Sequence, residues 1–211
     1  MPLPRPSAIY AIADQAALGM DALPGAVAAM AEAGVRWIQV RAKAASGGEL
    51  YRLLERTCRR LEGSGCALWL DDRADLAALF PVAGLHLGQR DLSAAAARQV
   101  VGGEIAIGCS THNEAELAAA DADPEVDVVA VGPVFPTTSK ERPDPVVGLD
   151  LVRRARARTR KQLVAIGGID ASNVASVLAA GADCAAVLSA VCRGDVARQC
   201  RQLLAAAEVS A

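Results

Sequence analysis

Charged side chains recur in this 211-residue sequence directly after short apolar runs, as if placed at the ends of strands. They are Arg41 and Lys43 after WIQV, Asp71 and Asp72 after ALWL, and Asp91 shortly after GLHLG. One or two carboxylates together with phosphate oxygens are the ligands that Mg²⁺ typically takes, and Arg and Lys bind phosphate charge. If the fold gathers these residues, they predict a magnesium-assisted diphosphate site with Asp72 and Asp91 as the metal ligands.

Each of these two aspartates has a simpler interpretation. The stretches DDRADLAAL and RDLSAAAARQV both enter predicted helices, and aspartate is a common N-cap of a helix. The magnesium hypothesis is favoured because both aspartates fall where Arg41, Lys43 and Lys140 are also expected. Only three of the 22 basic residues are lysines, and two of those three follow apolar runs. A lysine kept among arginines suggests a need for a compact point charge.

The stretch GPVFPTTSKERPDPVVG, residues 132–148, is longer than the few residues that usually join a strand to a helix. Its hydroxyl residues Thr137, Thr138 and Ser139 stand directly before Lys140. Hydroxyls beside a cation suit an anion with several oxygens, such as phosphate. A solvated surface loop is the alternative, because long connections usually run over the surface.

Two further runs, AIGGID and AVLSAV, place Gly168 and Ser189 at the ends of late apolar segments. Glycine lets the backbone approach a ligand closely, and backbone amides at such positions bind phosphate in many α/β proteins. The glycines could also serve only to turn the chain. This pattern therefore predicts a second phosphate site without indicating which substrate occupies it.

The elements that would position these residues alternate regularly along the chain. Eight apolar, strand-like runs are expected at residues 8–14, 37–41, 67–71, 84–88, 105–110, 128–132, 163–168 and 184–189. Helices are expected at residues 22–33, 48–62, 73–80, 93–101, 113–122, 149–158, 172–180 and 195–207. Strands that are apolar throughout and alternate with helices indicate a parallel sheet covered on both faces. Eight repeats favour an α/β fold of the single-domain (β/α)8 TIM-barrel type over a doubly wound open sheet.

The barrel would span residues 7–211 as one catalytic domain, after a flexible proline-rich tail at residues 1–6. In this fold the active site lies at the carboxyl ends of the strands, which is where the polar residues above are expected to meet. The formal charge of −2 and the pI near 5.7 give no reason to expect a nucleic-acid partner. Six cysteines without a CxxC pair, and no secretory leader, predict a cytoplasmic protein with reduced thiols. No run free of charge is long enough to span a membrane.

Taken together, these motifs resemble the thiamine-phosphate synthase (thiamine-phosphate pyrophosphorylase) family. The matching segments appear in family order over nearly the whole chain: IYAIAD, GVRWIQVRAK, LDDRADLA, GLHLGQRDL, IGCSTHNEAEL, VGPVFPTTSKE, VAIGGI and AVLSAV. HLGQRDL together with GPVFPTTSK is the most specific part. The resemblance implies a Mg²⁺-dependent TIM-barrel transferase of thiamine biosynthesis, acting on small phosphorylated molecules. It would join a hydroxymethylpyrimidine diphosphate to a thiazole phosphate, with or without a 2-carboxylate, releasing diphosphate.

The resemblance also assigns roles to residues. The pyrimidine diphosphate would be bound by Gln39, Val40, Arg41, Ala42, Lys43, Asp71, Ser110 and Lys140, among which Arg41, Lys43, Ser110 and Lys140 would be catalytic. The thiazole phosphate would be bound by Thr137, Thr138, Ser139, Gly168, Leu188 and Ser189, and magnesium by Asp72 and Asp91. The family reaction is dissociative and needs no side-chain nucleophile, so His86 and His112 are expected to take no catalytic role.

The sequence departs from the family at Asp71, where the family usually has asparagine. An acid there adds negative charge beside a diphosphate and should weaken its binding. A thiazole tautomerase is an alternative, although it should not need both Lys43 and the complete TTSK segment, and this chain has both. A non-catalytic phosphate-binding paralogue is a second alternative, for which Asp71 is the main support. The sequence leaves the oligomeric state open, a homo-oligomer included.

Overall fold

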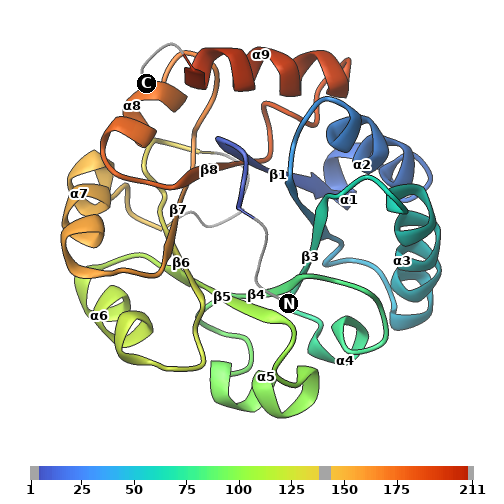
Figure 1. Ribbon diagram of the computed structural model, residues 1–211, viewed down its shortest axis with the longest axis horizontal. Coiled ribbons are helices and arrows are strands. Elements are labelled where there is room, and N and C mark those ends of the chain that lie inside the picture. Colours follow the sequence, from blue (N-terminus) through green and yellow to red (C-terminus); the bar gives the residue numbers. More distant parts are fainter. Residues whose placement is uncertain (1–4, 138–143, 209–211) are drawn as a thin grey trace.

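Eight parallel strands close into a barrel in the computed structural model of the chain, which describes residues 5–137 and 144–208. Seen down its axis in Figure 1, the strands form the central ring and the helices surround it. The strands are β1 (Ile9–Asp14), β2 (Trp37–Arg41), β3 (Ala67–Asp71), β4 (Gly84–Leu87), β5 (Ala106–Thr111), β6 (Val128–Val131), β7 (Gln162–Ile166) and β8 (Cys184–Val187). Pairing of β1 with β8 closes the ring, with Ile9 opposite Ala185, so an open doubly wound sheet is excluded.

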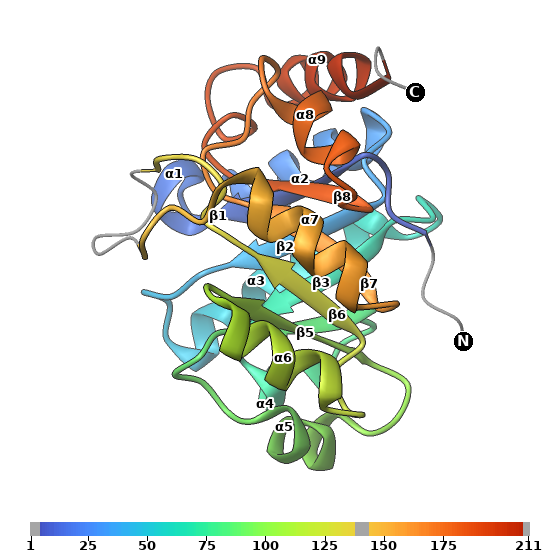
Figure 2. The ribbon, with the colours of Figure 1, turned by 90° about the vertical axis from the view of Figure 1, so that its left-hand side faces the viewer.

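The helices lie outside the ring and shield its outer face (Figure 2). They are α1 (Gln15–Leu18), α2 (Leu23–Glu32), α3 (Gly47–Leu61), α4 (Ala74–Ala77), α5 (Ala94–Val101), α6 (Glu114–Ala122), α7 (Gly148–Arg158), α8 (Val174–Ala179) and α9 (Val196–Glu208). Each of the eight expected helical stretches overlaps one of them, and the (β/α)8 prediction is confirmed. The short α1 was not expected; the Asp14 side chain caps it by accepting from the backbone N–H groups of Ala16 and Ala17.

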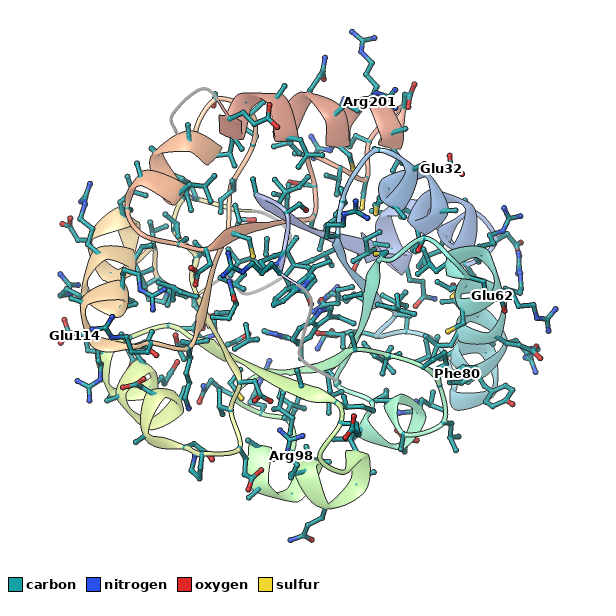
Figure 3. All side chains as sticks on the ribbon, viewed as in Figure 1. Glu32, Glu62, Phe80, Arg98, Glu114 and Arg201 are labelled. Carbon is teal, nitrogen blue, oxygen red and sulfur yellow. The ribbon has the colours of Figure 1, made fainter. Side chains whose placement is uncertain are left out.

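Charged residues on these helices mark the outside of the molecule. Glu32, Glu114 and Arg201 are exposed at the periphery of Figure 3, on α2, α6 and α9. Within the described ranges, none of the helices is both long and apolar enough to cross a membrane. Residues 1–4 lie outside the described residues, so the flexible tail remains a prediction.

Two hydrophobic cores follow from the alternation of side chains along each strand. On β1, Ile9, Ala11 and Ala13 face the helices, whereas Tyr10 and Ile12 face the barrel interior. The same period of two runs through β2 and β3, because successive side chains of a strand point to opposite faces. Inside the barrel the rings of Tyr10, Trp37 and Trp69 pack closely in tilted and edge-to-face arrangements, with the two indole centroids 4.8 Å apart.

This aromatic cluster fills the amino-terminal half of the barrel and leaves the carboxyl half to polar side chains. Along β2 the inward positions run from Trp37 to Gln39 and Arg41, and along β3 from Trp69 to Asp71. The change from apolar to polar along these two strands closes the barrel below and places charged groups in the cavity above it. The cavity therefore begins just beyond the aromatic residues on β1, β2 and β3.

Gly84 on β4 is required by this cluster. A Cβ atom at this position would lie 2.3 Å from the Trp69 ring, a distance that real contacts do not reach. We expect Gly84→Ala to lower the free energy of unfolding by about 1–3 kcal/mol through overpacking, as measured by chemical denaturation. Gly25→Ala is the matched control: Gly25 lies in α2 with open space around its Cβ position, so the same change should raise stability by about 0.5–1 kcal/mol. Equal effects at the two sites would contradict this account of the core.

Candidate active site

Opposite charges meet at the carboxyl ends of β1, β2 and β3. Arg41 pairs with Asp14, and its Nε lies 3.6 Å from Asp71 Oδ2. Lys43 Nζ lies 3.5 Å from the same Asp71 oxygen and 2.5 Å from Asp72 Oδ2. Burial works against the charge of Lys43, but the neighbouring Asp71 and Asp72 outweigh it and raise the pKa of the lysine. Lys43 is therefore cationic at neutral pH.

Asp71 is largely buried between these cations, and its side chain is 9% exposed. Burial raises its pKa, while the nearby charges of Lys43 and Arg41 lower it in part. Its Oδ2 makes no hydrogen bond of good geometry among the described residues, although two cations lie within 3.6 Å. Asp71 thus attracts Arg41 and Lys43 by charge at 3.5–3.6 Å without a hydrogen bond to either at Oδ2. Both cations can therefore also interact with another anion.

Asp72 and Asp91 converge on Lys43 from two successive loops, and neither is a helix cap. The residue before α4 is Arg73, and the α5 cap is Ser93, whose hydroxyl accepts from Ala96 N–H. Asp91 Oδ2 instead accepts a hydrogen bond of 2.8 Å from Gly88 N–H. Asp72 has φ of 62°, a left-handed conformation that non-glycine residues rarely adopt and that tends to be found at functional sites.

Asp91 lies close enough to Asp72 to affect the pKa of that carboxylate. Burial, then the charge of Asp71, and also a hydrogen bond to Asp91, raise the pKa of Asp72 to about 6, against the opposing effect of Lys43. Within the described ranges, no three His, Cys, Asp or Glu side chains form a metal-binding group. Magnesium often takes only one or two carboxylates and completes its shell with waters and phosphate. Crowded carboxylates with substrate phosphate beside them therefore fit this ion, and Asp72 and Asp91 could hold it.

Ser110, the next-to-last residue of β5, lines the same cavity. His86 Nε2 on β4 lies 2.9 Å from Ser110 Oγ, and Gln89 Nε2 donates to the Ser110 carbonyl at 2.6 Å. The imidazole fits here because Gly108 carries no side chain; a Cβ there would lie 2.9 Å from His86 Nδ1. His86 lines the cavity and contacts the serine, and the expectation that it takes no catalytic role stays a prediction.

The opposite wall of the cavity is mostly backbone. It is lined by Gly167, Gly168, Leu188, Ser189 and, from the connection after β6, Thr137. Gly168 has φ of +64°, and a Cβ on it would lie 2.5 Å from the Pro136 carbonyl oxygen. Only glycine allows the β6–α7 connection to approach the end of β7 this closely, so this wall offers exposed backbone groups of the kind that bind phosphate.

Most predicted site residues are brought together by the fold. Those that line this one cavity are Gln39, Arg41, Lys43, Asp71, Asp72, Ser110, Thr137, Gly168, Leu188 and Ser189. Asp91 lies beside it, bonded to the lining residue Gly88. Thr138, Ser139 and Lys140 lie outside the described residues, so their assignment stays a prediction.

Val40 and Ala42 are the two predicted residues whose side chains do not line the cavity. Both pack in the core between the barrel and the helices. The reason is strand alternation: Gln39, Arg41 and Lys43 point inward, so the residues between them point outward. Any contact of Val40 or Ala42 with a substrate would have to come from the backbone.

Sequence reasoning missed two features of the site. Asp14 ends β1, caps α1 and pairs with Arg41, so it orients that guanidinium. The rule that located the other polar residues, a charge at the end of an apolar run, applies equally to Asp14. The second feature is the floor of the cavity, where buried Gln39 Nε2 donates to Tyr10 Oη at 3.0 Å. Nothing in the local sequence indicates this contact, because it joins residues 29 positions apart.

The six cysteines take no part in the site. All are free thiols that are buried or half-buried. Burial raises the pKa of Cys66 and Cys200 to about 12 and that of Cys109 to about 11. Thiols with such pKa values are poor nucleophiles at neutral pH.

The fold and the site define a class: a (β/α)8 barrel with a cation- and carboxylate-lined cavity at the carboxyl ends of its strands. Residues 9–191 match the family described as Thiamine monophosphate synthase. The chain belongs to this thiamine-phosphate synthase family, whose members are transferases. The family membership expected from the sequence is thereby confirmed.

Individual relatives agree with this assignment. A thiamine-phosphate synthase of Koribacter versatilis is 44% identical over 191 residues, covering 89% of this chain and 88% of the relative. One from Acidothermus cellulolyticus is 42% identical over 173 residues, covering 80% of each chain. The solved structure of thiamine phosphate pyrophosphorylase from Pyrococcus furiosus superposes with a TM-score of 0.85 at 28% identity, over 96% of both chains. A tryptophan synthase α-subunit from the same organism, at 14% identity and a TM-score of 0.75 over 95% of this chain and 99% of the other, shares the fold alone.

Proposed function

We propose that the chain condenses 4-amino-2-methyl-5-(diphosphooxymethyl)pyrimidine with 4-methyl-5-(2-phosphoethyl)thiazole, or its 2-carboxy form, to give thiamine phosphate and diphosphate. The observation that carries the proposal is the two-sided cavity. Arg41, Lys43 and three aspartates gather on one side, and the Gly167–Gly168 backbone with Ser189 lies on the other. Two phosphorylated substrates that react with each other need such a pair of facing anion sites. The free thiols support a reducing cytoplasm as the compartment.

The pyrimidine diphosphate would bind on the β2–β5 side. Its residues are Gln39, Arg41, Lys43, Asp71 and Ser110, with the backbone of Val40 and Ala42 and, from the undescribed segment, Lys140. Arg41 and Lys43 would bind the diphosphate oxygens, where negative charge grows as the carbon–oxygen bond lengthens. Cations already aimed at that charge lower the barrier because they need no reorganisation during the reaction.

Asp72 and Asp91 would hold Mg²⁺ at the edge of this diphosphate subsite. When bound, the ion would supply positive charge to the leaving diphosphate. Lys43 Nζ, 2.5 Å from Asp72, would then keep the carboxylate oriented and share its charge with the phosphate oxygens. The crowding that raises the pKa of Asp72 supports this assignment, since a divalent cation relieves the repulsion between neighbouring carboxylates.

The thiazole phosphate would bind on the opposite side. Its residues are Thr137, Gly168, Leu188 and Ser189, with Thr138 and Ser139 from the undescribed segment. The exposed backbone around Gly168 suits phosphate oxygens, and Thr137 adds a hydroxyl donor. This placement directs the thiazole ring nitrogen across the cavity toward the pyrimidine methylene carbon.

The reaction would be dissociative. The bond between the methylene carbon and the diphosphate oxygen breaks, and its electron pair leaves with the diphosphate. The pyrimidine ring stabilises the resulting methylene cation until the lone pair of the thiazole nitrogen forms the new carbon–nitrogen bond. No side-chain nucleophile is needed in this mechanism, and burial makes the thiols poor nucleophiles by raising their pKa values.

A coupling assay with both substrates and Mg²⁺ tests the proposal, with thiamine phosphate measured by chromatography. We expect product from the native protein and its loss in Lys140→Ala. Conversion of the thiazole substrate without coupling would instead support a tautomerase. Binding of both phosphates without any reaction would support a non-catalytic paralogue, and full turnover in Lys140→Ala would contradict the assignment of that lysine.

Asp71→Asn is expected to lower the KM for the pyrimidine diphosphate about fivefold. Asp71 competes with the substrate for Arg41 and Lys43, since its Oδ2 lies 3.5–3.6 Å from both cations. The asparagine keeps the shape but removes the charge, so both cations become more available to phosphate. Steady-state kinetics at saturating thiazole phosphate measure the change, with the exposed Asp75→Asn as a control. An unchanged or higher KM in Asp71→Asn would remove the argument.

A further inference from the structure

The β6–α7 connection has two described parts, residues Gly132–Thr137 (the first arm) and Asp144–Val147 (the second arm). One imidazole, that of His112, contacts both. His112 Nδ1 lies 2.6 Å from the carbonyl oxygen of Gly132, where the first arm begins. His112 Nε2 lies 3.5 Å from Asp144 Oδ2 on the second arm. A carbonyl oxygen only accepts hydrogen bonds, so Nδ1 must carry a proton. This leaves Nε2 facing the Asp144 carboxylate, with which it pairs when the ring carries a proton on both nitrogens.

The base of this bridge is fixed. His112 directly follows β5, and its backbone N–H donates to Glu116 Oε2 at 2.7 Å. Asn113 caps α6 by accepting from Glu116 N–H at 2.9 Å and donates to the other Glu116 oxygen at 2.7 Å. The His112 side chain is 15% exposed. The imidazole therefore projects from a well-ordered helix start toward the cavity, where it can hold a less regular segment in place.

The two arms differ in how their backbones are hydrogen-bonded to the barrel. The first arm is bonded to β7 and its continuation, with Val134 N–H donating to Ile166 O at 2.8 Å and Phe135 N–H to Gly167 O at 3.0 Å. The second arm joins the first through Val147 N–H, which donates to Pro133 O at 2.8 Å. His112 adds a link from β5 to the second arm at Asp144, three residues earlier.

Both arms reach the cavity that the substrates would occupy. Thr137 on the first arm, Asp144 on the second and His112 itself all line it. Thr137 belongs to the thiazole-phosphate side in the proposed function. A change in the spacing of the arms would therefore be felt first by the substrate on that side.

We propose that His112 is a positioning residue that ties the Gly132–Thr137 and Asp144–Val147 arms together and so sets the affinity for the thiazole phosphate. This inference rests on the proposed function. It assigns His112 no proton transfer and no contact with the reacting atoms. Its effect is on the geometry of the wall that binds the second substrate.

The test uses three substitutions that divide the bridge. His112→Ala removes both contacts. His112→Asn keeps a donor near the Nδ1 position for Gly132 O, and His112→Gln keeps a polar group nearer Asp144. Glu114→Gln on α6 is the control, because Glu114 pairs with Arg154 at the protein surface. Circular dichroism and thermal unfolding confirm that each variant is folded.

Two readouts separate positioning from other roles. Calorimetric titration with the thiazole phosphate alone should give a dissociation constant about tenfold higher in His112→Ala, restored to within about threefold in His112→Asn. In the coupling assay, the KM for the same substrate should rise while kcat stays within about threefold. Asp144→Ala removes the other partner of the His112 Nε2 contact and leaves β5 unchanged. It should also raise the dissociation constant, and it serves as the test if His112→Ala fails to fold.

An unchanged dissociation constant in His112→Ala or in Asp144→Ala would overturn the inference. So would a fall in kcat of about a hundredfold at unchanged affinity, because that pattern indicates a catalytic group. Failure of the native protein to couple the two substrates would refute the proposed function instead. The titration does not depend on turnover, so the two failures are distinguishable.

Discussion

Asp91→Asn is expected to lower kcat/KM at physiological Mg²⁺ by at least about a hundredfold, with partial recovery as the Mg²⁺ concentration is raised. Asparagine can still accept the hydrogen bond that Gly88 N–H donates to Asp91 Oδ2, so the loop after β4 should keep its shape. What the substitution removes is one of two carboxylate charges that would bind the cation. Weaker cation binding, rather than misfolding, would then account for the loss.

The measurement is a Mg²⁺ titration of the coupling rate for the native and variant proteins. Asp150→Asn is the matched control, because Asp150 is an exposed acid on α7 whose ion pair with Arg153 lies at the surface, where such pairs contribute little. Its kcat/KM and its Mg²⁺ dependence should equal those of the native protein. If Asp91→Asn shows native kcat/KM at every Mg²⁺ concentration, Asp91 does not bind the ion and the proposed subsite is wrong.

Lys43→Ala is expected to lower kcat/KM for the pyrimidine diphosphate by about 10²–10³-fold. Lys43 Nζ lies within 3.5 Å of both Asp71 and Asp72, and its pKa is raised above the usual value despite burial. Removing it takes a cation from the developing diphosphate charge and leaves the two carboxylates facing the substrate uncompensated. Lys43→Arg keeps the charge with a different shape, so it should recover only part of the activity.

Lys161→Ala is the control for this experiment. Lys161 is another of the three lysines and adjoins the amino-terminal end of β7, where its Nζ donates to the carbonyls of Ala120 and Asp123 at 2.9 and 2.5 Å. We expect its removal to lower the free energy of unfolding by about 1–3 kcal/mol while kcat/KM stays within about twofold. The reverse result, native activity in Lys43→Ala and loss in Lys161→Ala, would contradict an active site at the carboxyl ends of the strands.

Closed barrels explain why so much of the site could be predicted. Each strand obeys a period of two, so Arg41 and Lys43 must share a face, and parallel strands must present their carboxyl ends together. From these local rules the sequence places Asp71, Ser110 and Gly168 at one end of the barrel. The same period, applied strictly, would also have turned Val40 and Ala42 away from the cavity, as the structure has them.

Local rules could not decide what Asp72 and Asp91 do. From the sequence each is an equally good helix cap, because capping depends only on neighbouring residues. The structure assigns the α5 cap to Ser93, places Arg73 without a side-chain cap bond before α4, and puts Asp72 at φ of 62°. That conformation follows from the packing of β3 against β4, where Asp72 N–H donates to His86 O. No signal in the residues around Asp72 indicates it.

The order of the elements, the alternation along each strand and the family can be read from patterns of residue type along the chain. Which side chains touch depends on the folded barrel: Arg41 with Asp14, His86 with Ser110, and His112 with Gly132 and Asp144. These contacts join residues 20 to 32 positions apart. Their distances depend on the register and closure of the whole barrel, which no local stretch of sequence encodes.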